Sequence, residues 1–425
     1  MIVVIFHRLG PYHWARLQAA SREYPLLAIE LSAETSEYPW DKVEAEAGFK
    51  RVTLFLEGDS RNATPRELAK RLIACLETHP VKVVAIPGWS DKGGLTALQW
   101  CVQHKVPAVV MSESTDWDDR RVLWKECIKR KLTGMCASAL VGGKPHRDYM
   151  VKLGMPAEQS FLGYDAVDNG YFSAMAEQSR KRKAENRRNY GLPEHYFLAS
   201  ARFIEKKNLR RLIQAYARYR QLEQTSDLRP PTSDLWSLVL LGDGPLRPDL
   251  CRLISDLSLQ HCVQLPGFKQ YPDLPAYYGC AQSFIHASTT EQWGLVVNEA
   301  MASGLPVLVS NRCGCAQDLV QEGVNGYTFD PYNVEQMAEL MLKISSAHEM
   351  ACAISPGLAR EAASPLSPGN CPLSAFGASS ARIVSEWGPD RFANGLKQAA
   401  DCALQVGPVE PTLLQRTLLR VLLAR

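Results

Sequence analysis

Short, continuous apolar runs alternate with amphipathic stretches along the sequence, and this alternation occurs twice. The first run, Ile2–Phe6, is followed by a helical pattern over Tyr12–Glu23. Continuous apolar runs separated by helical stretches indicate parallel strands that helices cover on both faces. The other strands predicted in the first half are Val52–Leu56, Val81–Ile86, Ala108–Met111 and Ala137–Val141.

The alternation stops at a charged stretch and then resumes. Ser179–Arg188 is dense in charged residues and lacks strand-forming ones, which is typical of a solvated helix or a linker. A chain of 425 residues is long enough for two cores, so we expect two Rossmann-like domains in series. The strands predicted in the second half are Phe197–Ala201, Ser237–Leu241, Cys262–Leu265, Ser283–His286 and Val307–Ser310, and its helices are Leu209–Arg220, Leu295–Ala302 and Asn333–Ser345.

We expect an N-terminal domain at 1–170, a charged linker at 171–195 and a C-terminal domain at 196–380. C-terminal helices at 381–425 are expected to pack back toward the N-terminal domain. The stretch Cys352–Ser380 is rich in Ala, Ser, Pro and Gly, which favours a loop. Thr412–Arg425 has leucines at helical spacing with arginines between them. This pattern favours a packed end helix, and a helix lying on a membrane surface is the alternative.

The composition excludes several classes of protein. A formal net charge of +3 argues against a protein that binds nucleic acid over its whole surface. The twelve cysteines are scattered without zinc-site spacing, and the first residues show no signal-peptide pattern. No apolar run reaches the roughly 18 to 20 residues of a membrane-spanning helix. We therefore expect a cytoplasmic protein, and a peripheral membrane contact stays open.

The segment Glu291–Phe329 carries the strongest functional pattern. It follows the predicted strand Ser283–His286, and a predicted helix begins directly after Gly294. The free amides of Gly294, Leu295 and Val296 at this helix N-terminus, together with the helix dipole, suit a phosphate group. Glycine also allows a ligand to approach the backbone closely. The segment therefore predicts an anion site.

Two glutamates flank this glycine. Glu291 lies in the loop before the helix, where a carboxylate can accept hydrogen bonds from sugar hydroxyls. Glu299 lies one turn and more into the helix, where it is suitably displaced to bind a ribose diol. Taken alone, such an E-x7-E pair is equally consistent with two solvated charges near a helix end, so it needs support from other residues.

Residues at other strand ends of the same half supply that support. Arg202 and Lys207 follow the strand Phe197–Ala201, and ligands of parallel α/β sheets gather at the carboxyl ends of strands. Two cations there neutralise a diphosphate without a metal ion. A tight turn follows the next strand, and a third strand end offers a place for a nucleobase; these positions are Gly242, Gly244, Gly267 and Phe268.

Together these segments resemble the C-terminal half of family-4 retaining glycosyltransferases of the GT-B fold, which belong to glycosyl transferases group 1. The resemblance covers about residues 197–345 and includes Glu299-Ala-Met-Ala-Ser-Gly-Leu-Pro306. It implies an α/β fold in which two Rossmann-like domains with parallel sheets face each other across a cleft. It also implies catalytic roles for Glu291 at the donor sugar and for Arg202 and Lys207 at the diphosphate, and a ribose contact for Glu299. The donor-binding set it implies is Arg202, Lys207, Gly242, Gly244, Gly267, Phe268, Glu291, Gly294, Leu295, Val296 and Glu299.

The N-terminal half departs from this family. Gly10 follows the first strand, where the family often has a glycine-containing loop, but the usual paired glycines are absent. His13 lies beside it, and Trp89 follows another strand, where its ring can stack on a sugar. Glu113 lies where many relatives carry a histidine, so it and Asp116 are candidates for that role. Gly10, His13, Trp89 and Glu113 are acceptor-side candidates, and ordinary loop polarity is an equally weighted alternative for them.

For two further polar groups of the first half, surface polarity is favoured over a functional site. Asp116 and Asp118 form an Asp-x-Asp pair, which in other settings holds a divalent cation against a diphosphate. We expect loop polarity and metal-independent activity instead. Glu126, Lys129 and Arg130 share one face of a predicted helix, for which a solvated face is favoured over a site for an anionic acceptor.

The predicted function is transfer of a sugar from a nucleoside-diphosphate sugar, with UDP or GDP, to an acceptor hydroxyl, and no bound cofactor is expected. Sugar, lipid-linked and small-molecule acceptors all stay open, as in polysaccharide or glycolipid biosynthesis. The alternatives are another GT-B enzyme, such as a nucleotide-sugar epimerase or a phosphorylase, and a non-catalytic nucleotide-sugar-binding protein.

Overall fold

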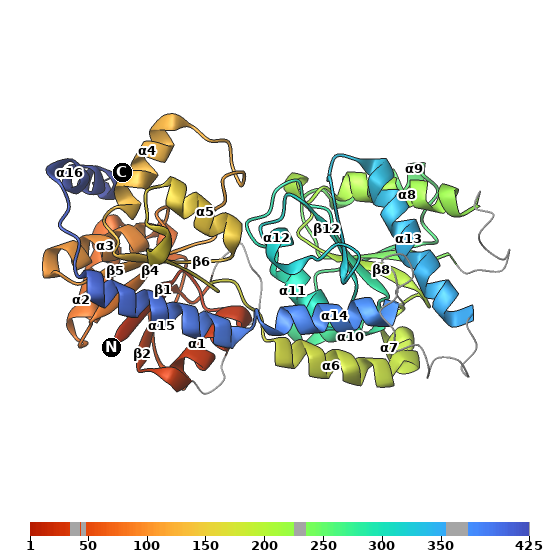
Figure 1. The fold of residues 1–425 in the computed structure, drawn as a ribbon, viewed down its shortest axis with the longest axis horizontal. Coiled ribbons are helices and arrows are strands. Elements are labelled where there is room, and N and C mark those ends of the chain that lie inside the picture. The colour runs from red at the N-terminus through yellow and green to blue at the C-terminus, as the bar shows by residue number, and fades with distance from the viewer. Residues whose placement is uncertain (35–42, 44–47, 225–234, 354–372, 425) are drawn as a thin grey trace. The chain divides into compact units, whose positions relative to one another are not determined.

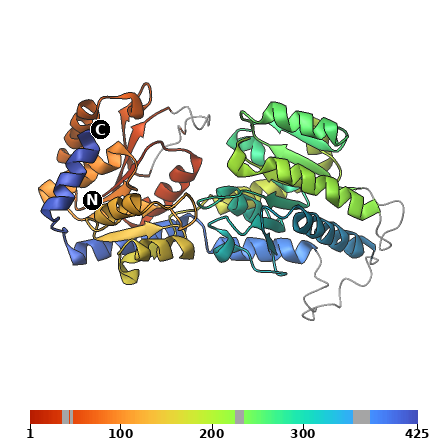
Figure 2. The ribbon, with the colours of Figure 1, turned by 90° about the horizontal axis from the view of Figure 1, so that it is seen from above.

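A computed structural model of the chain describes residues 1–34, 43, 48–224, 235–353 and 373–424. The chain forms two compact units (Figure 1). The first unit comprises Met1–Asp168 and Trp387–Arg425, and the second comprises Asn169–Glu386. Each unit is a parallel α/β sheet with helices on both faces (Figure 2).

The first unit is built on a seven-stranded sheet in the order β3-β2-β1-β4-β5-β6-β7, in which every neighbouring pair is parallel. Its strands are β1 (Ile2–Phe6), β2 (Leu26–Ser32), β3 (Lys50–Phe55), β4 (Val83–Pro87), β5 (Ala108–Ser112), β6 (Ser138–Val141) and β7 (Ser160–Leu162). Its helices are α1 (Pro11–Glu23), α2 (Pro65–Glu77), α3 (Lys92–His104), α4 (Leu123–Thr133), α5 (Lys144–Lys152), α15 (Pro389–Val406) and α16 (Leu413–Ala424).

Alternate residues of the central strand β1 pack on opposite faces of the first sheet. Val3 and Ile5 join a core with leucines of α2 and with Leu419 of α16. Val4 and Phe6 join a second core with residues of α1 and α15. Side chains of successive strand residues point to opposite faces, so a fully apolar strand such as β1 needs helices on both sides. The C-terminal helices α15 and α16 therefore complete the covering of the first sheet.

The second unit is built on a six-stranded parallel sheet in the order β10-β9-β8-β11-β12-β13. Its strands are β8 (Tyr196–Ser200), β9 (Ser237–Leu241), β10 (Val263–Gly267), β11 (Ser283–His286), β12 (Val307–Ser310) and β13 (Gly326–Phe329). Its helices are α6 (Asn169–Lys181), α7 (Lys183–Tyr190), α8 (Leu209–Gln224), α9 (Arg247–Asp256), α10 (Leu274–Cys280), α11 (Leu295–Ala302), α12 (Ala316–Leu319), α13 (Val334–Ala353) and α14 (Leu373–Ser385).

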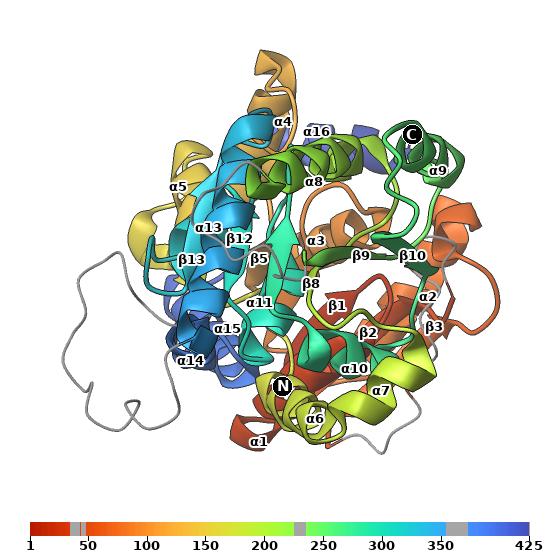
Figure 3. The same ribbon diagram turned by 90° about the vertical axis from the view of Figure 1, so that its right-hand side faces the viewer.

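Helices cover both faces of the second sheet. α8 and α13 pack on each other over one face, while α6 and α10 pack together on the other, as Figure 3 shows. The core under α8, α9 and α13 contains Phe197, Leu238 and Ile285 from three different strands. Both sheets have the strand order 3-2-1-4-5-6 of Rossmann-like folds, extended by one strand in the first unit. In this order the strand sequence reverses direction beside the first strand, between β1 and β4 in the first sheet and between β8 and β11 in the second.

Most predicted elements are present, and the differences lie at the predicted boundaries. The predicted linker 171–195 forms α6 and α7, which belong to the second unit. The predicted helical region 381–425 divides between the units, because α14 belongs to the second unit while α15 and α16 belong to the first. Residues 354–372 of the predicted loop Cys352–Ser380 lie outside the described residues, and Leu373–Ser380 are helical.

Candidate functional site

The predicted donor-site residues of the second unit follow the carboxyl ends of four strands that are neighbours in the sheet. In sheet order these strands are β10, β9, β8 and β11. Because parallel strands end at one edge of the sheet, their loops form one continuous surface. The residues that these loops and the start of α11 contribute are Gly267, Phe268, Gly242, Gly244, Arg202, Lys207, Glu291, Gly294, Leu295, Val296 and Glu299.

Backbone hydrogen bonds connect these loops in the same order. The amide of Gly242 donates to the carbonyl of Gly267 (3.0 Å), which joins the β9 and β10 loops. The amide of Phe203 donates to the carbonyl of Asp243 (2.8 Å). The amide of Thr289 donates to the carbonyl of Lys206 (2.9 Å), which joins the β8 and β11 loops. The four loops therefore hold one another in place through their backbones.

A buried asparagine strengthens this connection. Asn208 ends the short 3-10 helix η3 (Glu205–Lys207) in the left-handed conformation, with φ of 59°. Its side-chain amide donates to the carbonyls of Ala287 (3.0 Å) and Pro331 (2.7 Å), which follow β11 and β13. Asparagine is one of the few residues other than glycine that adopts this backbone conformation readily. Lys207 is thus presented from a backbone position fixed by three loops.

Lys207 and Glu291 form an ion pair at the centre of this surface. The Lys207 ammonium donates to Oε2 of Glu291, and the exposed fractions of the two side chains are 14% and 12%. His286, at the last position of β11, places Nε2 3.3 Å from the same oxygen. The hydroxyl of Ser288 also donates to Oε2 (3.3 Å). Three donors from two loops therefore converge on one carboxylate oxygen.

The electrostatics of the pair keep Glu291 ionised. Burial by itself raises the pKa of the Glu291 carboxyl, but the Lys207 ammonium and the His286 side chain hold that pKa well below its usual range. Burial lowers the pKa of His286, with Lys207 adding to the effect and Glu291 opposing it. At neutral pH the site therefore contains an anionic Glu291, a cationic Lys207 and a neutral imidazole.

The start of α11 has the backbone that a phosphate site requires. Gly294 is the N-cap residue, with φ of 103°, and no described side chain caps the helix there. The first amides of a helix lack intrahelical acceptors, so those of Leu295 and Val296 are available to a ligand. Trp293 is buried beside them and donates through Nε1 to Oδ1 of Asn298 (2.8 Å).

Glu299 is fully buried within α11, and the hydroxyl of Tyr278 donates to its Oε2 (2.7 Å). Arg202 is exposed at the start of the β8 loop, and Phe268 is 37% exposed after β10.

Gly242 has φ of 120°, and a Cβ at this position would lie 1.9 Å from the carbonyl oxygen of Ala201. Only glycine fits this close approach of two loops.

The predicted acceptor-side residues lie in the first unit. Gly10 is the N-cap residue of α1, and its amide donates to Nδ1 of His13 (3.3 Å). The His13 ring lies 4.5 Å from the ring of Phe6, centroid to centroid. Burial, with a smaller effect of Arg16, lowers the pKa of His13 to about 3. His13 is therefore a neutral residue at the carboxyl end of β1.

Glu113 follows β5 and faces a buried carboxyl group. Burial and the charge of Glu113 raise the pKa of Asp165 well above its usual range, against the opposing effect of Arg16. Asp165 and Arg16 are each 1% exposed, and a terminal nitrogen of Arg16 lies 3.8 Å from Oδ1 of Asp165. Asp165 is thus a partner of Glu113.

Trp89 belongs to a different cluster of the first unit. Lys129 lies over the Trp89 ring, with Nζ 5.9 Å from the ring centroid. The same ammonium donates to Glu126 (2.9 Å) and to the hydroxyl of Tyr149 (2.9 Å). The positive charge of Lys129 is thus already compensated by Glu126.

The Asp-x-Asp pair is engaged in ion pairs. Asp116 binds Lys152 (2.7 Å) and Asp118 binds Arg121. Within the described ranges, no group of three or more His, Cys, Asp or Glu side chains is placed to hold a metal ion.

No helix in the described part of the chain is both long enough and apolar enough to cross a membrane.

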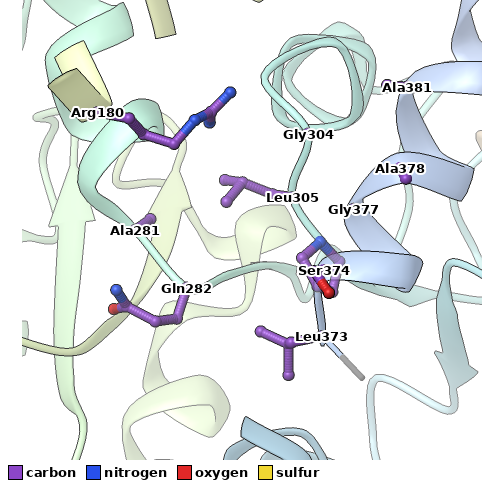
Figure 4. Close-up of a pocket in the computed structure, with 11 residues that line it drawn as sticks. Arg180, Ala281, Gln282, Gly304, Leu305, Leu373, Ser374, Gly377, Ala378 and Ala381 are labelled. Carbon is purple, nitrogen blue, oxygen red and sulfur yellow. The ribbon is translucent and has the colours of Figure 1, made fainter. Parts of the chain in front are cut away.

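A cavity of about 640 Å³ in the second unit lies apart from the donor-site loops (Figure 4). Gln282 and Leu305, which line it, precede β11 and β12 and so lie at the amino ends of these strands. The helix α14 forms another part of its wall through Ser374, Gly377 and Ala378. This cavity is therefore at the edge of the sheet opposite to Lys207 and Glu291.

A comparison with protein families finds a match in the second unit. Residues 182–356 match the family model described as "Glycosyl transferases group 1", and all of them lie within the second unit. The matched residues include the Lys207–Glu291 pair and the start of α11. These contacts therefore lie in the part of the chain that is similar to glycosyl transferases group 1.

Curated relatives match part of the chain. It is 28% identical over 239 residues to an alpha-D-kanosaminyltransferase of Streptomyces kanamyceticus, a match that covers 56% of this chain and 57% of the relative. It is 24% identical over 204 residues to an alpha-monoglucosyldiacylglycerol synthase of Acholeplasma laidlawii, covering 48% of each chain. The chain thus spans about half the length of these relatives.

Solved structures match almost the whole fold. A crystal structure of Anabaena Alr3699/HepE in complex with UDP has a TM-score of 0.64, and the match covers 93% of this chain and 98% of the other, at 16% identity. A structure of WaaG, a glycosyltransferase involved in lipopolysaccharide biosynthesis, has a TM-score of 0.61, covers 94% of this chain and 99% of the other, and is 15% identical. This likeness confirms the predicted fold class, two parallel-sheet α/β units of the GT-B type.

The sequence patterns missed the residues that contact the two glutamates. Ser288, His286 and Tyr278 contact Glu291 or Glu299, and none of them was predicted. A signal existed for His286, because it is the last residue of a correctly predicted strand and strand ends face the site. Tyr278 lies on α10, and its distance from Glu299 in sequence gave no signal.

Proposed function

We propose that the chain is a retaining, family-4 glycosyltransferase that moves a sugar from a nucleoside-diphosphate sugar to an acceptor hydroxyl. The observation that carries this proposal is the Lys207–Glu291 pair beside the N-terminus of α11, in the part of the chain that matches glycosyl transferases group 1. An anion site and a carboxylate that binds hydroxyls are needed side by side for a sugar diphosphate.

Each proposed role follows from the chemistry of a residue. Lys207, Arg202 and the amides of Gly294, Leu295 and Val296 neutralise the diphosphate as the bond from sugar to phosphate breaks. Glu291 accepts hydrogen bonds from the hydroxyls of the donor sugar, and Glu299 binds the ribose. Fixed charges of this kind are often the largest part of catalysis, because they are in place before the reaction begins.

The reaction forms a bond between the sugar and the acceptor oxygen while the bond to the diphosphate breaks. In the proposed same-face attack the acceptor proton passes to an oxygen of the leaving diphosphate, so no separate base is required. Gly10, His13, Trp89 and Glu113 are proposed to act on the acceptor side. Gly242, Gly244, Gly267 and Phe268 are proposed to surround the nucleoside. The reaction needs no metal ion in this proposal.

The donor is proposed to be a UDP- or GDP-sugar, since the matched fold occurs in structures with UDP and with UDP-glucose. The acceptor is a sugar, a lipid-linked molecule or a small molecule. One relative is named an alpha-monoglucosyldiacylglycerol synthase and another an alpha-D-kanosaminyltransferase, and both names are consistent with this range.

A peripheral membrane contact is part of the proposal. Leu123 and Trp124 at the start of α4 are 90% and 61% exposed, and Leu413 and Leu414 at the start of α16 are 82% and 62% exposed. The two helices touch, since Gln415 donates to the carbonyl of Lys131 (3.0 Å). Exposed Leu and Trp beside lysines and arginines suit a bilayer surface with anionic headgroups.

The experiment that tests the catalytic proposal is a transfer assay on Glu291→Ala and Lys207→Ala. We expect each variant to lose about 10²-fold or more in turnover, because each removes a charged contact at the reacting centre. Circular dichroism checks that both variants keep the fold. Near-normal turnover in either variant would show that the site is elsewhere.

A further inference from the structure

We propose that His286 and Ser288 are positioning residues that hold Glu291 by Oε2 and thereby turn Oε1 toward the donor sugar. This inference rests on the proposed function and adds to it the residues that set the orientation of the sugar-binding carboxylate. It also gives a role to His286, the last residue of β11.

The geometry of the carboxylate supports this assignment. The Nε2 atom of His286 and the hydroxyl of Ser288 lie at the same distance, 3.3 Å, from Oε2 of Glu291. They also lie 3.2 Å from each other. His286 is 3% exposed and Ser288 is fully buried, so both donors are fixed by packing. All of these contacts, and that of Lys207, are to Oε2, so these donors of the described chain leave Oε1 to a ligand.

The chemistry of the three groups fixes which atoms carry the protons. An ionised carboxylate only accepts hydrogen bonds, so the neutral imidazole must carry its proton on Nε2 to contact Glu291. The Ser288 hydroxyl donates its single proton to Oε2 and accepts from Nε2 through a lone pair. The three groups thus form a closed set of contacts. The Ser288 proton goes to Oε2 of Glu291, and the single Nε2 proton of His286 is shared between Oε2 and the Ser288 oxygen.

The Glu291 carboxylate needs contacts besides Lys207, because Lys207 has two partners in the proposed reaction. In the structure its ammonium is bound to Glu291, whereas a diphosphate at the start of α11 is a doubly charged competitor for the same ammonium. When Lys207 turns to the diphosphate, Glu291 loses its strongest contact. His286 and Ser288 keep the carboxylate in place at that moment, because they are neutral and the charge of the diphosphate attracts them less than it attracts the ammonium.

The test compares binding of a nucleotide sugar with binding of the nucleoside diphosphate alone. The probes are UDP-glucose and UDP, or GDP-mannose and GDP if the wild-type chain binds guanine nucleotides, measured by calorimetry on the full chain. We expect His286→Leu and Ser288→Ala to weaken binding of the nucleotide sugar roughly tenfold while leaving binding of the diphosphate within about twofold. His286→Gln should restore most of the loss, because the glutamine amide reaches the position of Nε2.

The controls separate positioning from a structural role. His261→Leu removes an exposed histidine elsewhere in the second unit and should change neither affinity. If His286→Leu binds both probes as wild type does, or if it loses both equally and His286→Gln does not restore them, the assignment is wrong. If the wild-type chain binds neither pair of probes, the proposed function itself fails and the assignment fails with it.

Discussion

Lys207 and Glu291 illustrate how single residues set the properties of the site. Each is largely buried, so each would be costly to bury alone, and together they compensate one another. The sequence identified both residues because they follow predicted strands of one half. It did not predict that they contact each other, since that depends on the rotamers of two long side chains. The contact means that a diphosphate competes with Glu291 for Lys207.

This pairing predicts a pH-dependent loss of stability in Lys207→Met. The pKa of Glu291 is depressed in the folded chain, so its ionised form stabilises the fold above the ordinary pKa of about 4.3 and this contribution is lost as the pH falls. Removing Lys207 leaves burial to raise that pKa. We expect the variant to lose about 3 kcal/mol of unfolding free energy at pH 7.5 and clearly less at pH 4.5, where Glu291 takes up a proton.

Urea unfolding of wild type and variant at the two pH values provides the measurement. Lys206→Met is the matched control, because in the described part of the chain it is Lys207, and not this neighbouring lysine, that forms the ion pair with Glu291. The loss of stability in Lys206→Met should therefore be nearly independent of pH. An equal loss at both pH values in Lys207→Met would contradict the assigned charge state of Glu291.

At the scale of elements, strands with continuous apolar runs were predicted closely. Ile2–Phe6, Ser237–Leu241, Ser283–His286 and Val307–Ser310 have the predicted bounds, because a parallel strand buried on both faces leaves an uninterrupted apolar signal. The patterns missed β2, β7 and β13. β7 is only three residues long, and β13 contains Gly326 and Thr328, so neither presents a continuous apolar run; both are held by the neighbouring strands that they pair with.

The loops at the strand ends depend on one close backbone contact, which makes Gly242→Ala a sharp test. A methyl group there would lie 1.9 Å from the carbonyl oxygen of Ala201, so the β8 and β9 loops would have to separate. We expect a loss of about 3 kcal/mol or more in unfolding free energy, together with weaker nucleotide binding.

The matched control for this substitution is Gly191→Ala. Gly191 also has a positive φ, 64°, but a Cβ there meets nothing within 4 Å. It should cost only about 1 to 2 kcal/mol, the strain of the left-handed conformation itself. Chemical denaturation of both variants gives the comparison, and equal losses would show that the contact with Ala201 is unimportant.

At the scale of the whole molecule, the sequence predicted two parallel α/β units but not where the chain passes between them. The charged stretch 171–195 lacks strand residues, which favoured a linker, yet its helices pack as part of the second unit and α6 touches α10. The helical pattern over 381–404 is interrupted at Trp387-Gly388-Pro389, where the chain passes from the second unit to the first. Such assignments depend on tertiary packing, which a local pattern does not contain.

Membrane binding is predicted to involve exposed apolar side chains on the surface of the first unit. Leu123→Ser combined with Trp124→Ser should reduce binding to vesicles that contain phosphatidylglycerol by about tenfold or more, because it removes the two most exposed apolar side chains of α4. Vesicle flotation gives the measurement. Leu257→Ser, at a 38% exposed position of the second unit, is the control and should leave binding unchanged. Unaltered vesicle binding in the double variant would exclude α4 from a membrane contact.

The central claim is that Lys207, Glu291 and the start of α11 form one site for a sugar diphosphate. Calorimetric titration of the full chain with a panel of UDP- and GDP-sugars tests it most directly. The account predicts that at least one nucleotide sugar binds, that Lys207→Ala weakens that binding at least tenfold, and that Glu291→Gln weakens binding of the nucleotide sugar but not of the nucleoside diphosphate. No heat with any nucleotide sugar, or unchanged affinity in Lys207→Ala, would contradict it.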